Sequence, residues 1–442
     1  MDTVSVELRE WGECGPEPGT ALAGISLGDN VAARDTAQQL TKAGMLAIDE
    51  LALGMRVRSF SYVGSVQMGR LRVTVRPKLE GAPLLNLVRY AYGLRNLKLF
   101  SQSAYATGTG TFQDLLIHQL AAETAELIAR GLHRRYERLE QSLPSPRGKI
   151  NFGEFLRQTG SAPATLPCVY HPRREDCLIN QVLLGGLYLA AGLTQDMELR
   201  TRLRRLSSHL EASASPVRPD RETLKQLDRQ SSRLTSAYDP ALQLIGLLAT
   251  AQGIALAPEQ PSIKLRGFLF DMNRFFQALV SRFIGQNLGG YLVRDDAHLR
   301  EMMHYLPGYQ LRDQRPPVLR PDLLVLEGAR VVAVLDTKYR DLWDRGLPPD
   351  MLYQLAMYAF SQTLGEATIL YPRTEPGAQE ARIEISEPSG GGVRATIVLR
   401  PVDLWRLEAT ISRGTDRERR KLAHALVFGA PHGADRLPAP TT

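Results

Sequence analysis

Two short apolar runs joined by a glycine-containing turn constrain this chain more than any other feature. The runs, residues 323–326 and 331–335, are rich in aliphatic and β-branched residues, which predicts a β-hairpin. Charged residues stand at its open end: Asp322 precedes the first run, and Asp336 and Lys338 follow the second. Charged residues do not contribute to the packing of an apolar sheet, so these three residues are candidates for catalysis or metal binding.

Folding the hairpin about Ala329 places Asp322 opposite Asp336. Because side chains alternate along a strand, Asp336 and Lys338 should share one face while the Thr337 side chain points away. Mg²⁺ takes one or two carboxylates, so Asp322 and Asp336 are predicted ligands, with the Thr337 backbone carbonyl as a third. Lys338 would orient or deprotonate a water, or offset charge on a phosphate, which suits phosphodiester hydrolysis. The alternative is a plain ion pair between Asp322 and Lys338.

A helix is predicted downstream of the hairpin, over residues 350–365, because an N-cap residue type begins this stretch and glycine ends it. Gln354 and Tyr358 lie four residues apart and share a face of this helix. Both are therefore candidate catalytic residues that reach a phosphate or Lys338. The alternative for Tyr358 is ordinary helix packing with its hydroxyl paired.

A second helix is predicted upstream, over residues 268–283, with Asn273, Gln277 and Ser281 as a polar stripe. We expect it to pack on the hairpin sheet. A helix, two strands and a helix carrying PD…DxK and QxxxY resemble the arrangement of PD-(D/E)xK nucleases, in particular their RecB-like branch. Such nucleases often carry a glutamate in the first helix. Gln277 is a possible replacement of that acidic position, and its amide binds a metal more weakly than a carboxylate.

The length of 442 residues favours a multidomain α+β protein. Its predicted segments are a β-rich N-terminal module at 1–82, a mainly helical basic domain at 83–257, an α/β PD-(D/E)xK endonuclease domain at 258–405, and a C-terminal helix with a disordered tail at 406–442. Within the module, residues 36–53 are predicted to be helical.

The net charge of +7 and a pI near 9.3 favour a polyanionic partner. Basic residues cluster in the middle of the chain, and these clusters would contact DNA phosphates or an acidic protein surface. The alternative is solvated helix faces with local ion pairs. The clusters are residues 133–138, 147–149, 173–174 and 200–205.

Three cysteines without a CxxC pair indicate a reducing, cytoplasmic setting. No secretion signal is visible at the N-terminus, and the most apolar segment, 182–193, is shorter than a membrane span, so no membrane partner is expected. No phosphate-binding loop is recognised, so nucleotide-driven work would have to come from a partner.

Further motifs resemble those of the McrC family, the nuclease subunit of McrBC-type modification-dependent restriction systems, over roughly residues 1–405. They follow the order of that family: Tyr62-Val63-Gly64, Arg76-Pro77-Lys78, Gly131-Leu132 with Tyr136, Arg147-Gly148-Lys149-Ile150, Asn180, and the core of Asp322, Asp336 and Lys338.

The resemblance implies that the N-terminal and middle regions dock on a hexameric McrB-like AAA+ GTPase, insert into its pore and stimulate hydrolysis. The ring would recognise methylated double-stranded DNA and translocate it, while this chain would cut it with Mg²⁺, for which Mn²⁺ should substitute. Removal of residues 1–110 is then expected to leave the nuclease domain folded.

Two other functions stay open. A regulatory subunit that binds the ring and DNA without cleaving is favoured by Gln277. It is opposed by the intact Asp336-Thr337-Lys338 and by Gln354 with Tyr358. A freestanding RecB-like exonuclease would leave the long N-terminal half without a role.

Overall fold

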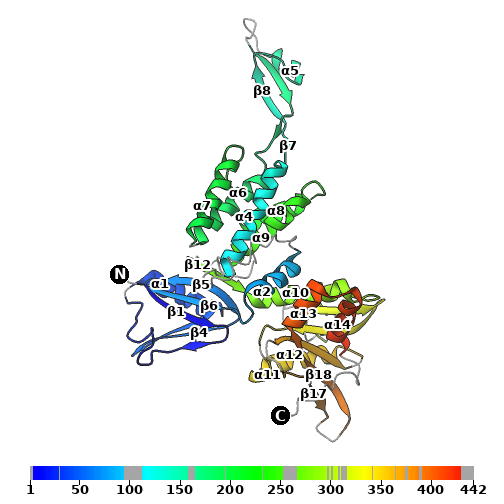
Figure 1. Ribbon diagram of the computed structural model, residues 1–442. Coiled ribbons are helices and arrows are strands. Elements are labelled where there is room, and N and C mark those ends of the chain that lie inside the picture. The colour runs from blue at the N-terminus through cyan, green and yellow to red at the C-terminus, as the bar shows by residue number, and fades with distance from the viewer. Residues whose placement is uncertain are drawn as a thin grey trace. The chain divides into compact units, whose positions relative to one another are not determined.

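The computed structural model shows a mixed α/β chain with several sheets (Figure 1). It divides into two compact units, one of Met1–Ala106 with Leu269–Thr442 and one of Thr107–Phe268. The residues that it describes are 3–28, 30–93, 112–157, 165–194, 196–230, 232–251, 266–295, 298–299, 302–306, 309, 316–340, 342–363, 365–373, 377–387 and 391–429.

The division differs from the predicted segments, because the N-terminal module and the predicted nuclease segment belong to one unit. The helix α2 (Gly81–Tyr92), expected at the start of the helical domain, also lies in this unit and packs against α10 (Met272–Asn287). The predicted boundary at 257/258 and the predicted tail from 430 lie outside the described residues.

The N-terminal module contains two sheets. The first has the order β1-β6-β5-β12, in which β1 and β6 are parallel and β5 and β6 antiparallel. Its strands are β1 (Val4–Arg9), β6 (Leu71–Arg76), β5 (Tyr62–Met68) and β12 (Arg266–Asp271). The second has the order β2-β4-β3, with β2 (Glu13–Cys14), β4 (Gly54–Ser59) and β3 (Leu46–Leu51).

The helix predicted at 36–53 is wrong in its second half. Helix α1 (Val31–Lys42) ends before Gly44, which adopts a left-handed φ of +65°. The N–H of Met45 then bonds back to the carbonyl of Leu40, which closes the helix. The chain continues as the strand β3.

The other part of this unit is a six-stranded sheet of order β13-β14-β15-β16-β18-β17. The pairs β15/β16 and β16/β18 are parallel, and the outer pairs are antiparallel. The strands are β13 (Leu292–Asp295), β14 (Leu323–Glu327), β15 (Arg330–Thr337), β16 (Glu366–Arg373), β18 (Val393–Asp403) and β17 (Ala381–Ser386).

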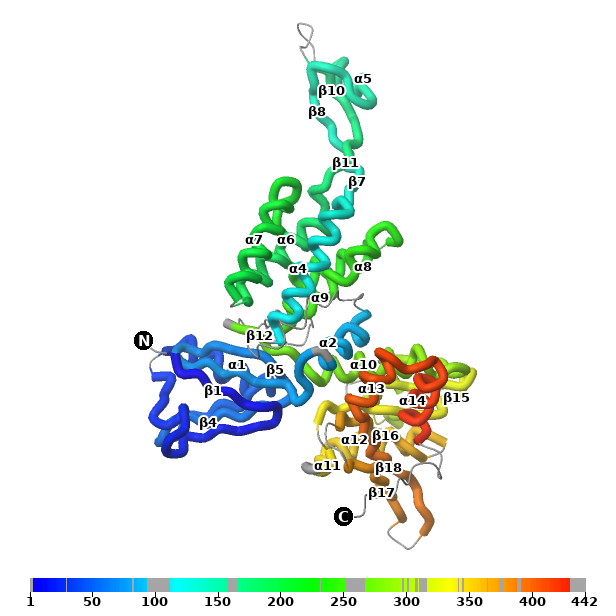
Figure 2. The backbone as a smooth tube through the Cα atoms, viewed as in Figure 1, coloured from blue at the N-terminus to red at the C-terminus, as the bar shows by residue number. Residues whose placement is uncertain are grey.

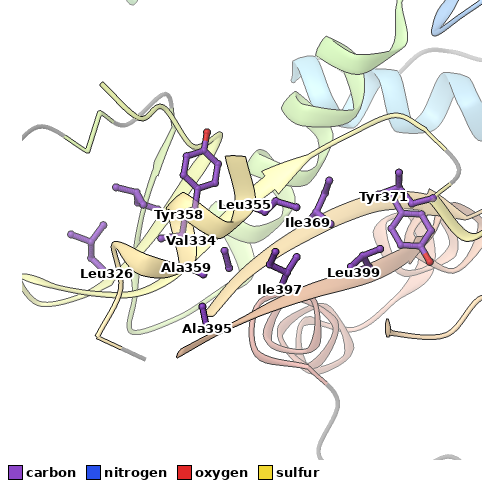
Figure 3. Close-up of a cluster of buried hydrophobic side chains, with 13 residues drawn as sticks. Leu326, Val334, Leu355, Tyr358, Ala359, Ile369, Tyr371, Ala395, Ile397 and Leu399 are labelled. Atoms are coloured by element: carbon purple, nitrogen blue, oxygen red, sulfur yellow. The ribbon is translucent and has the colours of Figure 1, made fainter. Parts of the chain in front are cut away.

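Helix α12 (Pro349–Phe360) covers one face of this sheet. Its Leu355, Tyr358 and Ala359 pack in a buried cluster with strand residues such as Ile369 and Ile397 (Figure 3). The opposite face carries α10, α13 (Leu404–Arg413) and α14 (Asp416–Phe428) (Figure 2). The expected packing of the upstream helix on the hairpin sheet is thus observed.

The upstream helix begins later than predicted. Residues 268–271 belong to the strand β12, and the carboxylate of Asp271 caps α10 by accepting hydrogen bonds from the N–H groups of Asn273 and Arg274. Aromatic residues at 268 and 270 fit both a strand and a helix, so periodicity alone placed the boundary wrongly.

The second unit is mainly helical, as predicted, but it also contains short strands that were not. Its helices are α4 (Phe112–Arg130), α5 (Phe152–Phe155), α6 (Leu178–Leu193), α7 (Met197–Glu211), α8 (Arg221–Gln230) and α9 (Asp239–Ala251). Its strands are β7 (Arg135–Tyr136) with β11 (Arg173–Arg174), and β8 (Leu139–Leu143), β10 (Leu166–Tyr170) and β9 (Lys149–Ile150). Among the described helices, none is long and apolar enough to cross a membrane.

Candidate active site at the open end of a hairpin

A β-bulge sets which residues face each other at the open end of the hairpin. Strands β14 and β15 pair antiparallel, and their register shifts between Val325 and Leu326. Beyond the shift Leu323 pairs with Leu335. One further step along the ladder brings Asp322 to the level of Asp336, as the sequence predicts. Without the bulge, Leu335 would take that place.

Asp336 is the buried carboxylate of this group, with 4% of its surface exposed. Burial, and after it the charge of Asp322, raise the pKa of Asp336 to about 7, while Lys338 lowers it. The Nζ atom of Lys338 lies 4.0 Å from Oδ2 of Asp336. The ion pair found for Lys338 in the described part of the chain is therefore with Asp336, and not with Asp322.

Asp322 has both carboxylate oxygens engaged. Oδ2 accepts hydrogen bonds from the N–H of Thr337 at 2.7 Å and from its hydroxyl at 2.6 Å, and Oδ1 accepts one from Nε2 of Gln277 at 3.0 Å. The prediction that the Thr337 side chain points away from the carboxylates is therefore wrong. Asp322 lies in a bend just before β14, where strand alternation no longer directs its side chain.

Gln354 and Tyr358 lie beside this group but are bonded to each other. Nε2 of Gln354 donates to the Tyr358 hydroxyl at 2.6 Å, and that hydroxyl donates to the backbone carbonyl of Arg320 at 2.9 Å. Burial, and to a smaller extent the charges of Asp336 and Asp322, raise the pKa of Tyr358 to about 12, while the hydrogen bond from Gln354 lowers it. The Tyr358 hydroxyl thus donates its proton to a hydrogen bond within the protein, which matches the alternative of helix packing with a paired hydroxyl.

The residues at this site suit a hard divalent cation. Two carboxylates share the site, and Asp336 resists ionisation there, so a bound cation would relieve an existing electrostatic penalty. In the part of the chain that the structure describes, no group of three or more His, Cys, Asp or Glu side chains is placed to hold a metal. The acidic residues of this site are therefore Asp322 and Asp336, and Gln277 is hydrogen-bonded to Asp322.

Sequence reasoning missed two buried residues next to the site. Tyr339, which directly follows Lys338, is 2% exposed, and its hydroxyl donates to Glu10 at 3.3 Å. Glu10 is 4% exposed. The charged residue Glu10 directly after β1 could have been noticed in the sequence, but no local pattern indicates that it contacts Tyr339.

The basic clusters are partly neutralised within the second unit. Exposed ion pairs link Arg134 to Glu175, Arg138 to Glu140 and Arg174 to Glu137. Pairs of this kind contribute little stability, on the order of 0–1 kcal/mol. They match the solvated-face alternative, and DNA contact by these clusters stays a prediction.

Two of the motif residues in this unit have structural roles. Gly148 has a φ of +71°, and a Cβ atom there would lie 2.5 Å from the carbonyl oxygen of Val169. The amide of buried Asn180 donates to the carbonyl of His133 at 2.9 Å and accepts from the Tyr238 hydroxyl at 2.7 Å.

A solved structure shares this fold. A chain of the Thermococcus gammatolerans assembly described as a refined half-complex of McrB AAA+ hexamers with bound McrC is 19% identical, over 94% of this chain and 98% of that one, with a TM-score of 0.63. A chain of the cryo-EM structure of the Thermococcus gammatolerans McrBC complex is 20% identical over 66% of this chain and 89% of that one, with a TM-score of 0.47.

The family model of the McrBC 5-methylcytosine restriction system component matches residues 57–372. The chain belongs to this family, and the resemblance inferred from its motifs is confirmed. No curated protein matches the chain.

Proposed function

We propose that this chain is the Mg²⁺-dependent endonuclease subunit of a modification-dependent restriction complex. It would cleave double-stranded, methylated DNA in the cytoplasm when assembled with a McrB-like AAA+ GTPase ring, whose hydrolysis it would stimulate. The observation that carries the proposal is the pairing of buried Asp336 with Lys338 next to Asp322, within a chain of the McrBC family. The solved assembly of McrB hexamers with bound McrC supports a ring partner.

Asp322 and Asp336 would hold the Mg²⁺ ion, and the backbone carbonyl of Thr337 would add an oxygen. When bound, the ion supplies positive charge to a phosphate and lowers the pKa of a water. The hydrogen bonds from Thr337 and Gln277 fix the orientation of the Asp322 carboxylate before any ligand arrives. The site therefore spends little free energy on reorganisation.

Lys338 would act on the substrate side. Its ammonium is a flexible point charge, which suits a non-bridging phosphate oxygen or the attacking water. With Asp336 ionised, the 4.0 Å separation keeps the ammonium near the reacting group without consuming all of its donors. Gln354 retains a second amide hydrogen that can reach a phosphate, while Tyr358 positions Gln354 by accepting its first.

A second candidate function is a regulatory subunit that binds the ring and DNA but does not cleave. Gln277 favours it, because a neutral amide contacts Asp322 where a further carboxylate would strengthen metal binding. The two functions differ in one observable, which is phosphodiester cleavage.

The deciding experiment measures cleavage of methylated and unmethylated DNA by this chain with its ring partner, Mg²⁺ and GTP or ATP. The variant Lys338→Ala should lose cutting while ring association is kept. Arg330→Ala, at the exposed turn end of the same strand, is the matched control and should cut normally. Absence of cutting by the wild-type complex, with nucleotide hydrolysis stimulated, would establish the regulatory function instead.

A further inference from the structure

The segment that carries Lys338 is anchored on its far side by the N-terminal module. Lys338 lies just past the end of β15, and its N–H makes a bond to the sheet, to the carbonyl of Leu370 at 3.0 Å. The next residue, Tyr339, is bound instead to Glu10, which lies 329 positions earlier in the sequence. Lys338 is therefore fixed on one side by its hydrogen bond to Leu370 in the sheet, and on the other side by the contact of Tyr339 with Glu10 outside the sheet.

The backbone of Tyr339 is held by a second contact. Its N–H donates to Oδ1 of Asn273 at 3.2 Å, and the amide of Asn273 donates to the Ser61 hydroxyl at 2.5 Å. The carbonyl of Ser61 in turn accepts the N–H of Met272 at 2.9 Å. Helix α10 and the start of β5 thus meet at the residue that follows the lysine, and the ring of Phe276 packs 6.0 Å from the Tyr339 ring.

The turn that presents Glu10 is itself constrained. Trp11 adopts a φ of +61°, which is the one positive value found for a non-glycine residue in the described part of the chain. Such a conformation persists where surrounding contacts determine it. Here the N–H of Trp11 donates to the carbonyl of Phe60, and the guanidinium of Arg340 lies 5.5 Å from the Trp11 ring. Two consecutive residues after Lys338 thus contact this turn.

We propose that Glu10 and Tyr339 are a positioning pair that sets the place of Lys338, so that the N-terminal module forms part of the nuclease scaffold. The role of Lys338 in it rests on the proposed function. Neither side chain touches the substrate in this role. Because the same module is expected to meet the ring, a partner that shifts the Glu10 turn would shift Lys338 as well.

Tyr339→Phe tests the pair with the least damage, since it removes the hydroxyl and keeps the ring that packs on Phe276. Glu10→Gln keeps an oxygen that accepts from Tyr339. Tyr62→Phe is the matched control, because its hydroxyl also joins the module to α10, through Asp271 at 3.3 Å, without contacting the segment after Lys338. Two readouts are taken: amide hydrogen exchange of residues 336–340 in the protein alone, and kcat and KM of DNA cleavage by the complex.

We expect Tyr339→Phe to raise exchange of segment 336–340 by about tenfold and to lower kcat by about tenfold with KM unchanged. Glu10→Gln should show neither the faster exchange nor the loss of kcat, and Tyr62→Phe should stay near wild type. Wild-type exchange and kcat in Tyr339→Phe, or equal losses in Tyr62→Phe, would overturn the proposal. If the wild-type complex does not cleave, the proposed function fails, and exchange alone still decides whether the pair holds the segment.

Discussion

The side-chain amide of Gln277 donates a hydrogen bond to Oδ1 of Asp322 at 3.0 Å, across 45 positions of sequence. This contact gives a role to the residue that occupies the expected acidic position of the first helix. A carboxylate there would have no hydrogen to donate, and would add a negative charge beside two others. The amide therefore holds Asp322 in place, and under the proposed function it does so where a carboxylate would bind Mg²⁺ more strongly.

Gln277→Glu should reverse this balance. In the absence of metal, we expect the variant to be less stable by about 1–3 kcal/mol, because it loses a hydrogen bond and gains like-charge repulsion. With Mn²⁺ present, affinity should rise about tenfold, since a third carboxylate joins the site. Chemical denaturation with and without Mn²⁺, and calorimetric titration, measure both effects. Gln277→Leu is the control without added charge, and equal Mn²⁺ affinity in both variants would contradict the prediction.

Divalent-cation binding should depend on pH through Asp336. Its pKa is about 7, and the ion competes with the proton for the ionised carboxylate. Affinity for Mn²⁺ should therefore rise by about tenfold between pH 6 and pH 8 and then level off. Isothermal titration at three pH values in buffers of different ionisation enthalpy would also detect the released proton. A flat profile would show that Asp336 is not a ligand.

Asp336→Asn should abolish cleavage and yet stabilise the metal-free protein. A folded-state pKa raised from 3.8 to about 7 means that wild-type stability falls as pH rises through this range and stays low above it. The neutral variant lacks this loss, so at pH 8 it should be more stable by about 1–3 kcal/mol. Denaturation at pH 4 and pH 8 tests the sign. A larger gain in stability of Asp336→Asn over wild type at pH 4 than at pH 8 would contradict the raised pKa of Asp336.

Glu10 should give a similar signature in another part of the same unit. Burial raises its pKa to about 8, and its contacts with Tyr339 and Lys78 lower it only in part. Wild-type stability should thus fall between about pH 4.5 and pH 8, as the unfolded chain ionises first. Glu10→Gln should remove that dependence and be more stable at pH 8 by about 2–4 kcal/mol. Identical pH profiles of the two proteins would show that Glu10 is not buried in this way.

The N-terminal module should be needed for the stability of the nuclease part. Removing residues 1–80 takes away the strand beside β12, the Ser61 partner of Asn273 and the Glu10 partner of Tyr339. We expect the remaining chain to melt roughly 10 °C or more below the full chain. This reverses the expectation from sequence that the nuclease domain stays folded without residues 1–110. Replacing residues 107–265 by a flexible linker is the control, since it removes the second unit, and a truncation that melts like wild type would restore the earlier expectation.

Local sequence patterns predicted several of the helices and strands that the structure shows. The glycine-containing turn and the two β-branched runs located the strands β14 and β15, and the helix predicted within residues 406–442 corresponds to α14, which begins at the capping box of Thr415 and Glu418. The failures also have local causes. A left-handed Gly44 turned a predicted helix into a strand, and the short strands of the second unit are too brief to leave a periodic signal.

The sequence by itself determined which residues stand at the open end of the hairpin, because charge, turn and strand signals are all encoded within about 20 positions. Only the tertiary structure decided how they are held. The bulge between Val325 and Leu326 sets their register, while Gln277 comes from the helix α10 and Glu10 from the turn after the first strand. Such contacts depend on which distant segments pack together. Burial raises the pKa of a carboxyl group only after that packing has excluded water.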